Sequence, residues 1–472
     1  MSALQSFANI FNVPDLRKRV LFTFFVLAVY RLGAHVPTPG VDPHAIDEFF
    51  KASAGSIFGF LDIFSGGALR RLSVFALGIM PYISASIILQ LLTVVWPYLE
   101  KLSKEGEMGR KKITQYTRYG TVLLSVIQAT GIALWLEKQT TPGGAPLVPD
   151  PGWGFSLITI LTLTTGTIFI MWLGEQITER GIGNGISLII FAGIVVTLPS
   201  AIFGLFRQIR EGTINLLTMI FVLAFMIGIV ALIVFVERAQ RRIPVQYAKR
   251  VVGRRVYGGQ NTYLPLRVNT GGVIPIIFAI SILALPAYLA QLAGPESTLL
   301  GLPIGPWMQS VAAALAQGHP FYVLLYATGI VFFCYFYTSI VFNPVDTADN
   351  MRKYGGFIPG IRPGKKTADY IDIVLSRLTI IGATYLTFVA LLPDFLSSGF
   401  KFQALPWIGP QLEAALPAFF TQGFGFNFYF GGTSLLIVVG VAMDTVNQVE
   451  SKLVEHHYSG FLKKTRIRGR RS

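Results

Sequence analysis

Charged residues are scarce in this chain. Asp, Glu, Lys and Arg make up 13% of its 472 residues, whereas apolar residues make up 52%. An ordinary soluble domain carries about 25% charged residues. The composition therefore excludes a soluble enzyme and favours a protein embedded in a membrane.

Cysteine is almost absent as well. The single cysteine, Cys334, lies within an apolar run. This excludes a disulfide framework and a cysteine-rich metal site. We interpret Cys334 as a packing residue.

The residue patterns of common ligand sites are also missing. The five histidines lie at the ends of apolar runs or in loops, without metal-ligand spacing. Residues 360–366 depart from a phosphate-binding loop at Pro359 and Lys366. Residues 181–185 are rich in glycine but follow no predicted strand, so we interpret them as a flexible turn into a helix. We expect no catalytic residue, no metal and no cofactor, and so a protein that is not an enzyme.

Long apolar runs dominate what is present. Each is long enough to cross the bilayer as a helix, and ten such runs predict an all-α polytopic membrane protein. The runs cover residues 20–36, 74–95, 119–137, 154–173, 185–206, 214–236, 272–292, 319–342, 371–392 and 427–449. An even number of crossings places both termini on the same side of the membrane.

Basic residues are distributed very unequally between the two sides. Of the 39 Lys and Arg residues, 31 fall on the side of the termini and 8 on the other side. Because Lys and Arg concentrate in cytoplasmic loops, both termini are predicted to be cytoplasmic. The net charge of +15 is therefore mostly an orientation signal.

Two cytoplasmic loops carry more basic residues than orientation requires. Residues 237–271 alternate Val, Tyr and Thr with Arg and Gly, which predicts a small β-hairpin. Residues 343–370 are punctuated by Pro and Gly and indicate an ordered loop. Both loops either simply obey the positive-inside rule or form a docking platform for an acidic or phosphate-rich partner. By contrast, the outward loops 138–153 and 293–318 are poor in charge and are predicted to be connectors without a folded domain.

One predicted crossing is broken into two unequal pieces. Residues 74–96 carry no charge over 23 positions, enough to span the ~30 Å hydrocarbon layer as a helix. Residues 57–64 form an apolar arm too short to span, and a Ser-Gly-Gly sequence at 65–67 separates the two pieces. Irregular backbone at membrane depth must be buried in protein or line a cavity. The arm therefore predicts a stoppered channel or a transporter with a broken helix.

The predicted spans contain few groups that could couple transport to ions. Asp62 and Asp444 are the only carboxylates deep enough to serve, and ion-coupled transporters usually need several ionisable groups at mid-membrane. Isoleucines instead recur at helical spacing in several spans. Such residues usually face lipid or pack between helices, and pore lining is the less common alternative.

Four long motifs resemble the SecY family of protein-conducting channels. They are FSGGAL at 64–69 with ALGIMPYISASI at 76–87, GEQITERGIGNGIS at 174–187, the NP…TADN…PGIRPG pattern within 343–364, and FGGTSLLI at 430–437. The resemblance extends over essentially the whole chain. It implies two inverted five-helix halves, a re-entrant plug helix at about 57–72, and a hydrophobic pore ring.

The resemblance also implies specific roles for individual residues. The plug would contain Phe60, Asp62, Phe64, Ser65, Gly66, Gly67, Arg70 and Arg71, and the pore ring would consist of Ile79, Ile83, Ile186, Ile190, Ile277 and Ile437. A lateral gate, through which signal sequences reach lipid, would include Ser84, Ser86, Gln90, Thr121, Ser125, Gln128, Ser281, Leu285 and Thr328. Docking residues for cytoplasmic partners would be Arg238, Arg241, Arg242, Lys249, Arg250, Arg254, Arg255, Arg352, Lys353, Arg362, Lys365 and Lys366. Arg362 occupies the position expected to matter most for the motor step.

We therefore expect a channel that translocates unfolded secretory polypeptides and inserts membrane proteins laterally into the bacterial cytoplasmic membrane. The implied partners are the small membrane subunits SecE and SecG, the motor ATPase SecA, the ribosome with its RNA, signal-bearing polypeptides and the lipid bilayer. The expected organisation is an N-terminal half (1–206), a periplasmic hinge (207–214), a C-terminal half (215–450) and a basic cytosolic tail (451–472). The alternative from the broken crossing is a secondary transporter of small solutes.

Overall fold

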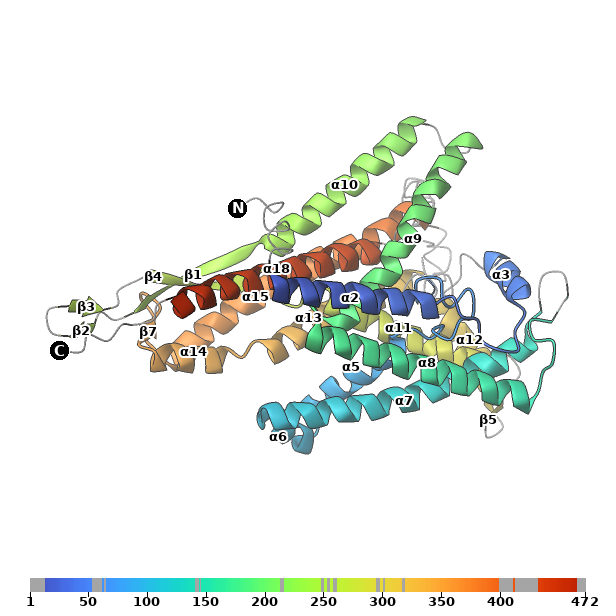
Figure 1. Cartoon of the computed structure of the whole chain (residues 1–472), viewed down its shortest axis with the longest axis horizontal. Coiled ribbons are helices and arrows are strands. Elements are labelled where there is room, and N and C mark those ends of the chain that lie inside the picture. Colours follow the sequence, from blue (N-terminus) through green and yellow to red (C-terminus); the bar gives the residue numbers. More distant parts are fainter. Residues whose placement is uncertain are drawn as a thin grey trace. The chain divides into compact units, whose positions relative to one another are not determined.

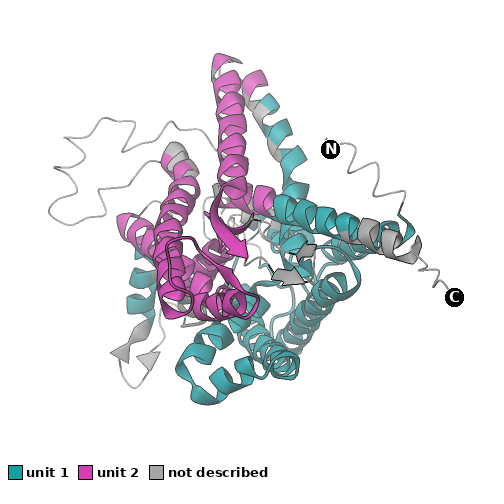
Figure 2. Cartoon of the chain, turned by 90° about the vertical axis from the view of Figure 1, so that its left-hand side faces the viewer, with its two compact units in different colours: residues 1–207, 284–316, 441–472 teal, residues 208–283, 317–440 magenta. Residues whose placement is uncertain are grey.

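The computed structural model divides into two compact units. Unit 1 contains residues 1–207, 284–316 and 441–472, and unit 2 contains residues 208–283 and 317–440 (Figure 2). The structure describes residues 13–52, 62, 65–140, 144, 146–212, 216–247, 250–252, 255–257, 261–293, 298–299, 302–315, 319–398, 411 and 432–464. The expected division into halves at 206 and 215 stays a prediction.

Unit 1 is built mainly from helices in its N-terminal stretch. These are α2 (Pro14–Gly33), α3 (Pro43–Ala52), α5 (Met80–Val95), α6 (Pro97–Lys104), α7 (Glu107–Lys138), α8 (Trp153–Arg180) and most of α9 (Gly185–Arg210). α7 packs along both α5 and α8 (Figure 1). Close approach depends on glycine: a Cβ at Gly166 of α8 would lie 1.9 Å from the Val74 carbonyl oxygen.

Unit 2 combines helices with a small sheet. Its elements are α10 (Leu216–Arg238), β1 (Gln240–Tyr247), β2 (Arg250–Val252), β3 (Arg255–Tyr257), β4 (Asn261–Arg267), the first part of α11 (Ile274–Ala293), α13 (Pro320–Val341), α14 (Pro344–Lys353), β7 (Gly356–Phe357) and α15 (Lys365–Ser398). The hairpin predicted for residues 237–271 is confirmed, since β1 pairs antiparallel with β4 from Gln240↔Arg267 to Gln246↔Asn261. It extends from the end of α10 (Figure 1).

The two basic loops share one sheet, which the sequence did not predict. β7, from the loop 343–370, pairs with Gln246 and Tyr247 of β1, giving the strand order β4-β1-β7. Beneath this sheet lies an apolar cluster of residues from both loops and from α15. Its buried members are Ile243, Val245, Leu266, Met351, Ile358, Ile371, Val374 and Leu378.

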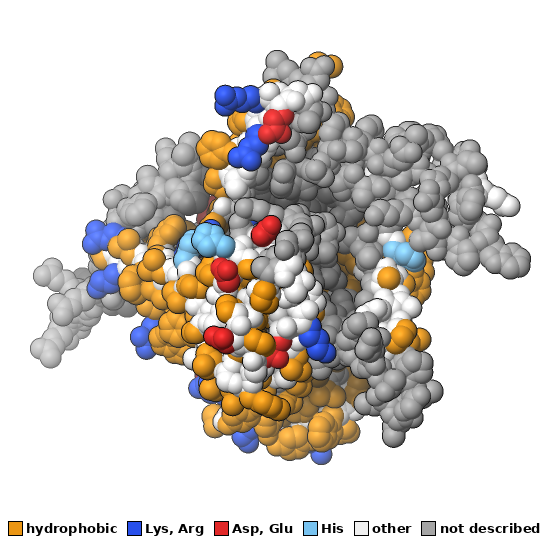
Figure 3. All heavy atoms as spheres, turned by 90° about the vertical axis from the view of Figure 1, so that its right-hand side faces the viewer, with side chains coloured by type: hydrophobic (Ala, Val, Ile, Leu, Met, Phe, Trp, Pro, Cys, Tyr) orange, Lys and Arg blue, Asp and Glu red, His pale blue; other side chains and the backbone are white. Residues whose placement is uncertain are grey.

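A polytopic membrane fold accounts for the helices. Among the described residues, six helices are long and apolar enough to cross a membrane, or seven if the bent pair α5 and α6 forms one span. A helix occupies each of the ten predicted runs, the last being α18 (Gly432–Lys464). Apolar side chains cover much of the face in Figure 3, and α8 exposes Trp153, Leu157 and Leu161 along one side. Such a surface suits contact with lipid.

The second predicted crossing begins later than the sequence suggested. Residues 74–79 form turns, and the helix starts only at Met80. The cause is local: Gly78 has φ +57°, which ends any helix approaching from the N-terminal side, and Pro81 occupies the first turn of α5. α5 is therefore 16 residues long, and the chain then bends by 99° into α6.

The connectors are also more structured than expected. Loop 293–318 contains the paired strands β5 (Thr298–Leu299) and β6 (Leu302–Pro303), followed by helix α12 (Ile304–Ala314). In loop 138–153, Thr140 pairs with Pro146 in an isolated bridge. Helix α3 is a further element that the apolar runs did not indicate.

Candidate functional site

The six isoleucines expected to form the pore ring are mostly buried on their helices. Ile79 precedes α5 and Ile83 lies in its first turn, while Ile186 and Ile190 lie in α9. In unit 2, Ile277 lies in α11 and Ile437 in α18. Ile186 is half-buried and the other five are at most 6% exposed. That the isoleucines of unit 1 and those of unit 2 form one ring stays a prediction.

A hydrogen-bonded corner positions the start of α9 and its isoleucines. The Gly185 N–H donates to the Thr178 hydroxyl at 2.9 Å, and the Asn184 side chain accepts from the Ile186 N–H at 3.1 Å. A Cβ at Gly185 would lie 1.9 Å from the Gly174 carbonyl oxygen, so only glycine allows this approach. The sequence expectation of a flexible turn was too loose, because the corner is held by side-chain caps.

The described part of the expected plug is a closed, hydrogen-bonded loop. Phe60 and Phe64 lie outside the described residues. The Asp62 carboxylate accepts from the Arg70 N–H at 2.8 Å, and the Asp62 carbonyl accepts from the Gly67 N–H at 3.0 Å. The Ser65 hydroxyl also donates to the Asp62 carbonyl at 3.0 Å.

The charged groups of this loop differ in exposure. The Arg70 and Arg71 side chains are exposed, whereas the Asp62 side chain is partly buried. Asp62 therefore closes the loop from within, and the two arginines face outward.

Two residues of α2 hold the same loop, and the sequence did not point to them. The Tyr30 hydroxyl donates to the Ser65 carbonyl at 3.3 Å, and Arg31 Nη1 donates to the Gly66 carbonyl at 2.6 Å. Because the partners are backbone atoms 35 positions away, no residue pattern could reveal them.

Polar residues expected at the lateral gate lie mainly inside unit 1. Ser84, Thr121, Ser125 and Gln128 are buried on α5 and α7, which pack against each other. The Thr121 and Ser125 hydroxyls donate to carbonyls of their own helix. Among the described residues, the Gln128 side-chain oxygen has no hydrogen-bond partner.

The remaining gate residues have mixed environments. Gln90 donates to the Ser86 hydroxyl at 3.0 Å within α5. Ser281 is buried in α11, Thr328 is exposed on α13, and the side chain of Leu285 lies outside the described residues. Their joint role as a gate stays a prediction.

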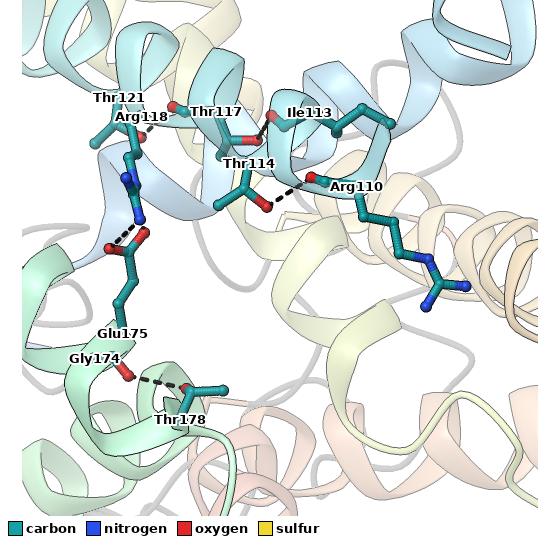
Figure 4. A network of polar contacts seen from close by, with 9 residues as sticks. All are labelled: Arg110, Ile113, Thr114, Thr117, Arg118, Thr121, Gly174, Glu175 and Thr178. Atoms are coloured by element: carbon teal, nitrogen blue, oxygen red, sulfur yellow. Dashed lines mark hydrogen bonds and ion pairs between the residues drawn. The ribbon is translucent and has the colours of Figure 1, made fainter. Parts of the chain in front are cut away.

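An ion pair that the sequence did not suggest joins α7 to α8. Arg118 Nε and Nη2 donate to the two carboxylate oxygens of Glu175, both at 2.8 Å (Figure 4). The Glu175 side chain is only 15% exposed. Bidentate pairing of this kind fixes geometry as well as charge. It orients α8 immediately before the glycine corner that starts α9.

The basic residues of the loops 237–271 and 343–370 lie around the small sheet. Arg238 ends α10, Arg241 and Arg242 lie in β1, and Arg250 and Arg255 lie in β2 and β3. Lys249 and Arg254 lie outside the described residues. Described side chains of this group, those of Arg238, Arg241 and Arg242, are exposed.

The second basic loop presents its cations in the same way. Arg352 and Lys353 occupy the last turn of α14, where cations complement the helix dipole. Arg362 and the first residues of α15, Lys365 and Lys366, are exposed. The Arg362 carbonyl accepts from the Thr367 hydroxyl at 3.0 Å, which fixes the turn that presents its side chain.

Together, the fold and these features define a polytopic α-helical membrane protein with a folded basic surface on its loops. The family model for SecY matches residues 73–446. The chain is 49% identical to protein translocase subunit SecY of Escherichia coli (strain K12) over 97% of this chain and 96% of that protein. It is 46% identical to the subunit of the same name from Aquifex aeolicus (strain VF5), over 96% of this chain and 98% of that protein. The chain belongs to the SecY family.

Solved structures of the same fold agree with this assignment. One described as "The structure of a protein conducting channel" matches with a TM-score of 0.59 at 17% identity, over 93% of both chains. Another, described by the plug domain that stabilises the closed state of SecY, matches with a TM-score of 0.61 at 18% identity, also over 93% of both. Identities this low establish the fold alone.

Proposed function

We propose that this chain is a protein-conducting channel that moves unfolded secretory polypeptides across a membrane and releases membrane segments sideways into lipid. The observation that carries the proposal is the identity of 46–49% to translocase subunits over 96–97% of the chain. No feature of the relatives or of the similar structures supports the alternative of a small-solute transporter.

The proposed mechanism uses the features described above. A partner docks on the basic surface, a signal helix opens the gate between the second and third spans and the seventh and eighth, and the plug moves aside. The polypeptide then passes a ring formed by the six isoleucines. A hydrophobic constriction blocks ions by excluding water, yet it can fit around an extended chain.

The partners and location follow from the same proposal. SecE and SecG would flank the channel in the bacterial cytoplasmic membrane, with both termini of this chain in the cytoplasm. SecA and the ribosome would dock on the loops 237–271 and 343–370. One similar solved structure is described as Sec61 in a ribosome-channel complex, and another as the Ssh1 complex bound to the ribosome, which supports the ribosome as a partner. ATP hydrolysis would belong to the motor, since this chain is proposed not to be an enzyme.

The proposal is tested by protection of a precursor protein from protease. Proteoliposomes would contain this chain with SecE and SecG, and would receive SecA, ATP and a signal-bearing precursor. We expect protease protection that requires both ATP and an intact signal. Saturable uptake of a small solute without precursor protection would contradict the proposal.

A further inference from the structure

The base of the expected plug is attached to the rest of unit 1 on both sides. We propose that Tyr30 and Arg31 are positioning residues that fix the plug base, residues 65–72, to α2, so that this base stays in place when the channel opens. This inference rests on the proposed channel function and adds the contacts that hold the plug base.

Arg31 makes the strongest of these contacts. Its guanidinium donates to the Gly66 carbonyl at 2.6 Å, and a charged donor strengthens such a bond. Arg31 is one of only 8 Lys or Arg residues on the outward side, where orientation disfavours a cation. A function in holding the plug base explains why a cation lies there.

Tyr30 acts beside it from a rigid position. Its side chain is 2% exposed, and its ring stacks on Phe75 with centroids 5.9 Å apart. From there its hydroxyl donates to the Ser65 carbonyl at 3.3 Å. Consecutive carbonyls of the plug base are thus held by consecutive residues of α2.

The opposite side of the base is pressed against α9. Gly66 has φ +66°, and a Cβ built on it would lie 2.8 Å from the Gly193 Cα. This contact is backbone against backbone and leaves no room for a side chain. Gly66 therefore lies between Arg31 of α2 and Gly193 of α9.

The C-terminal end of the base is fixed by two further backbone bonds. The Thr38 N–H donates to the Leu72 carbonyl and the Val74 N–H donates to the Val36 carbonyl, both at 2.9 Å. Leu72 is buried and has φ +40°, a conformation that costs free energy and persists only where surrounding contacts impose it. A segment held at both ends, with imposed strain at its last residue, is suited to stay in place.

The first test removes the contacts one at a time and measures ion leak through idle channels in vesicles. We expect Arg31→Gln to raise the leak about tenfold, Tyr30→Phe to raise it less, and Arg31→Lys to restore most of the seal. Lys138→Gln is the matched control, because it removes an exposed cation at the end of α7, away from the plug base, and should leave the seal intact. Arg31→Gln should also accept precursors with defective signals, which a merely destabilised protein would not do.

An unchanged leak in both Arg31→Gln and Tyr30→Phe would overturn the inference. ATP-dependent protection of a normal precursor serves as the internal reference for each variant. If the unmutated chain gives no such protection, the proposed channel function is refuted, and this outcome is separate from a failure of the inference about Tyr30 and Arg31. If Arg31→Gln fails to assemble, Tyr30→Phe decides the question, because it loses one hydroxyl and keeps the stacked ring.

The second test locks the C-terminal end of the base. Pro37 and Ser73, the residue that directly follows Leu72, face each other as an antiparallel bridge pair, so cysteines there, in a Cys334→Ser background, are placed to form a disulfide. We expect the oxidised channel to translocate at the rate of the reduced one, because this end of the base does not need to leave. Blocked translocation that a reductant restores would show that this end of the base moves, contrary to the inference.

Discussion

Asp62 illustrates how a single residue can close a loop from both its side chain and its backbone. Its carboxylate accepts from the Arg70 N–H at 2.8 Å, and its carbonyl accepts from the Ser65 hydroxyl at 3.0 Å. The side-chain bond needs only an acceptor oxygen and not a negative charge.

This requirement predicts different outcomes for two substitutions of Asp62. Asn keeps an oxygen that accepts from the Arg70 N–H and carries no charge to desolvate, so Asp62→Asn should seal the idle channel at least as well as Asp does. Asp62→Ala removes the acceptor and should cost the closed loop about 1 kcal/mol. The measurement is ion leak in vesicles. An equal leak for Asp62→Asn and Asp62→Ala would contradict the explanation.

Ile437 provides the residue-scale test of the ring. It is fully buried in α18, and an amide at this position would admit water to an apolar constriction. Ile437→Asn should therefore conduct ions when idle and accept precursors with defective signals. Ile437→Val, which stays apolar and costs about 1 kcal/mol of stability, is the matched control. Equal ion conductance of Ile437→Asn and Ile437→Val would show that Ile437 does not belong to the ring.

At the scale of elements, the apolar runs predicted most of the helices because membrane helices must satisfy their backbone internally. α7 and α8 each contain the predicted run, and α13 covers all but the two end residues of the run 319–342. The alternation of residues likewise predicted the β1–β4 hairpin. Both signals are patterns among neighbouring residues, and a single sequence displays such patterns directly.

Elements set by distant contacts could not be predicted in this way. β7 is two residues long and is a strand only because it meets β1, about a hundred positions earlier. The late start of α5 depends on the backbone conformation at Gly78, and the plug base depends on α2. For the expected site, sequence resemblance named its residues, whereas the contacts through Tyr30, Arg31 and Arg118 required the structure.

The shared sheet predicts that the two basic loops act as one unit. Ile371 of α15 is fully buried in the cluster beneath β1, β4 and β7. Ile371→Ala should loosen this cluster by about 2–5 kcal/mol while the membrane helices stay assembled. We expect faster proteolysis within both loops together and weaker SecA binding. Proteolysis confined to one loop would show that the loops are independent.

Arg362→Glu tests the basic docking surface without changing the sheet that supports it. Arg362 is exposed, so reversing its charge should leave the sheet folded and protease-resistant. It should nevertheless abolish SecA-driven export, because the docking surface for an acidic partner is disrupted. Normal export by this variant, measured as ATP-dependent precursor protection, would exclude a docking role for Arg362.

For the molecule as a whole, the orientation in the membrane rests on the split of 31 to 8 basic residues. Cys334 is buried, and replacing it with Ser gives a background for single cysteines. Thr262→Cys in β4 would mark the basic hairpin. Trp153→Cys, at a residue 87% exposed, would mark the N-terminal end of α8, which is predicted to lie on the outward side. The two positions should respond oppositely to a thiol reagent that cannot cross the membrane.

In intact cells, the reagent should label Trp153→Cys and spare Thr262→Cys, and permeabilisation should expose both. This result would place the 31 basic residues, the shared sheet and both termini in the cytoplasm, where a motor or a ribosome can reach them. Labelling of Thr262→Cys alone in intact cells would show that the molecule has the opposite orientation in the membrane. The basic surface would then face away from every source of ATP and nascent chain, and the docking role proposed for it would fail together with the orientation.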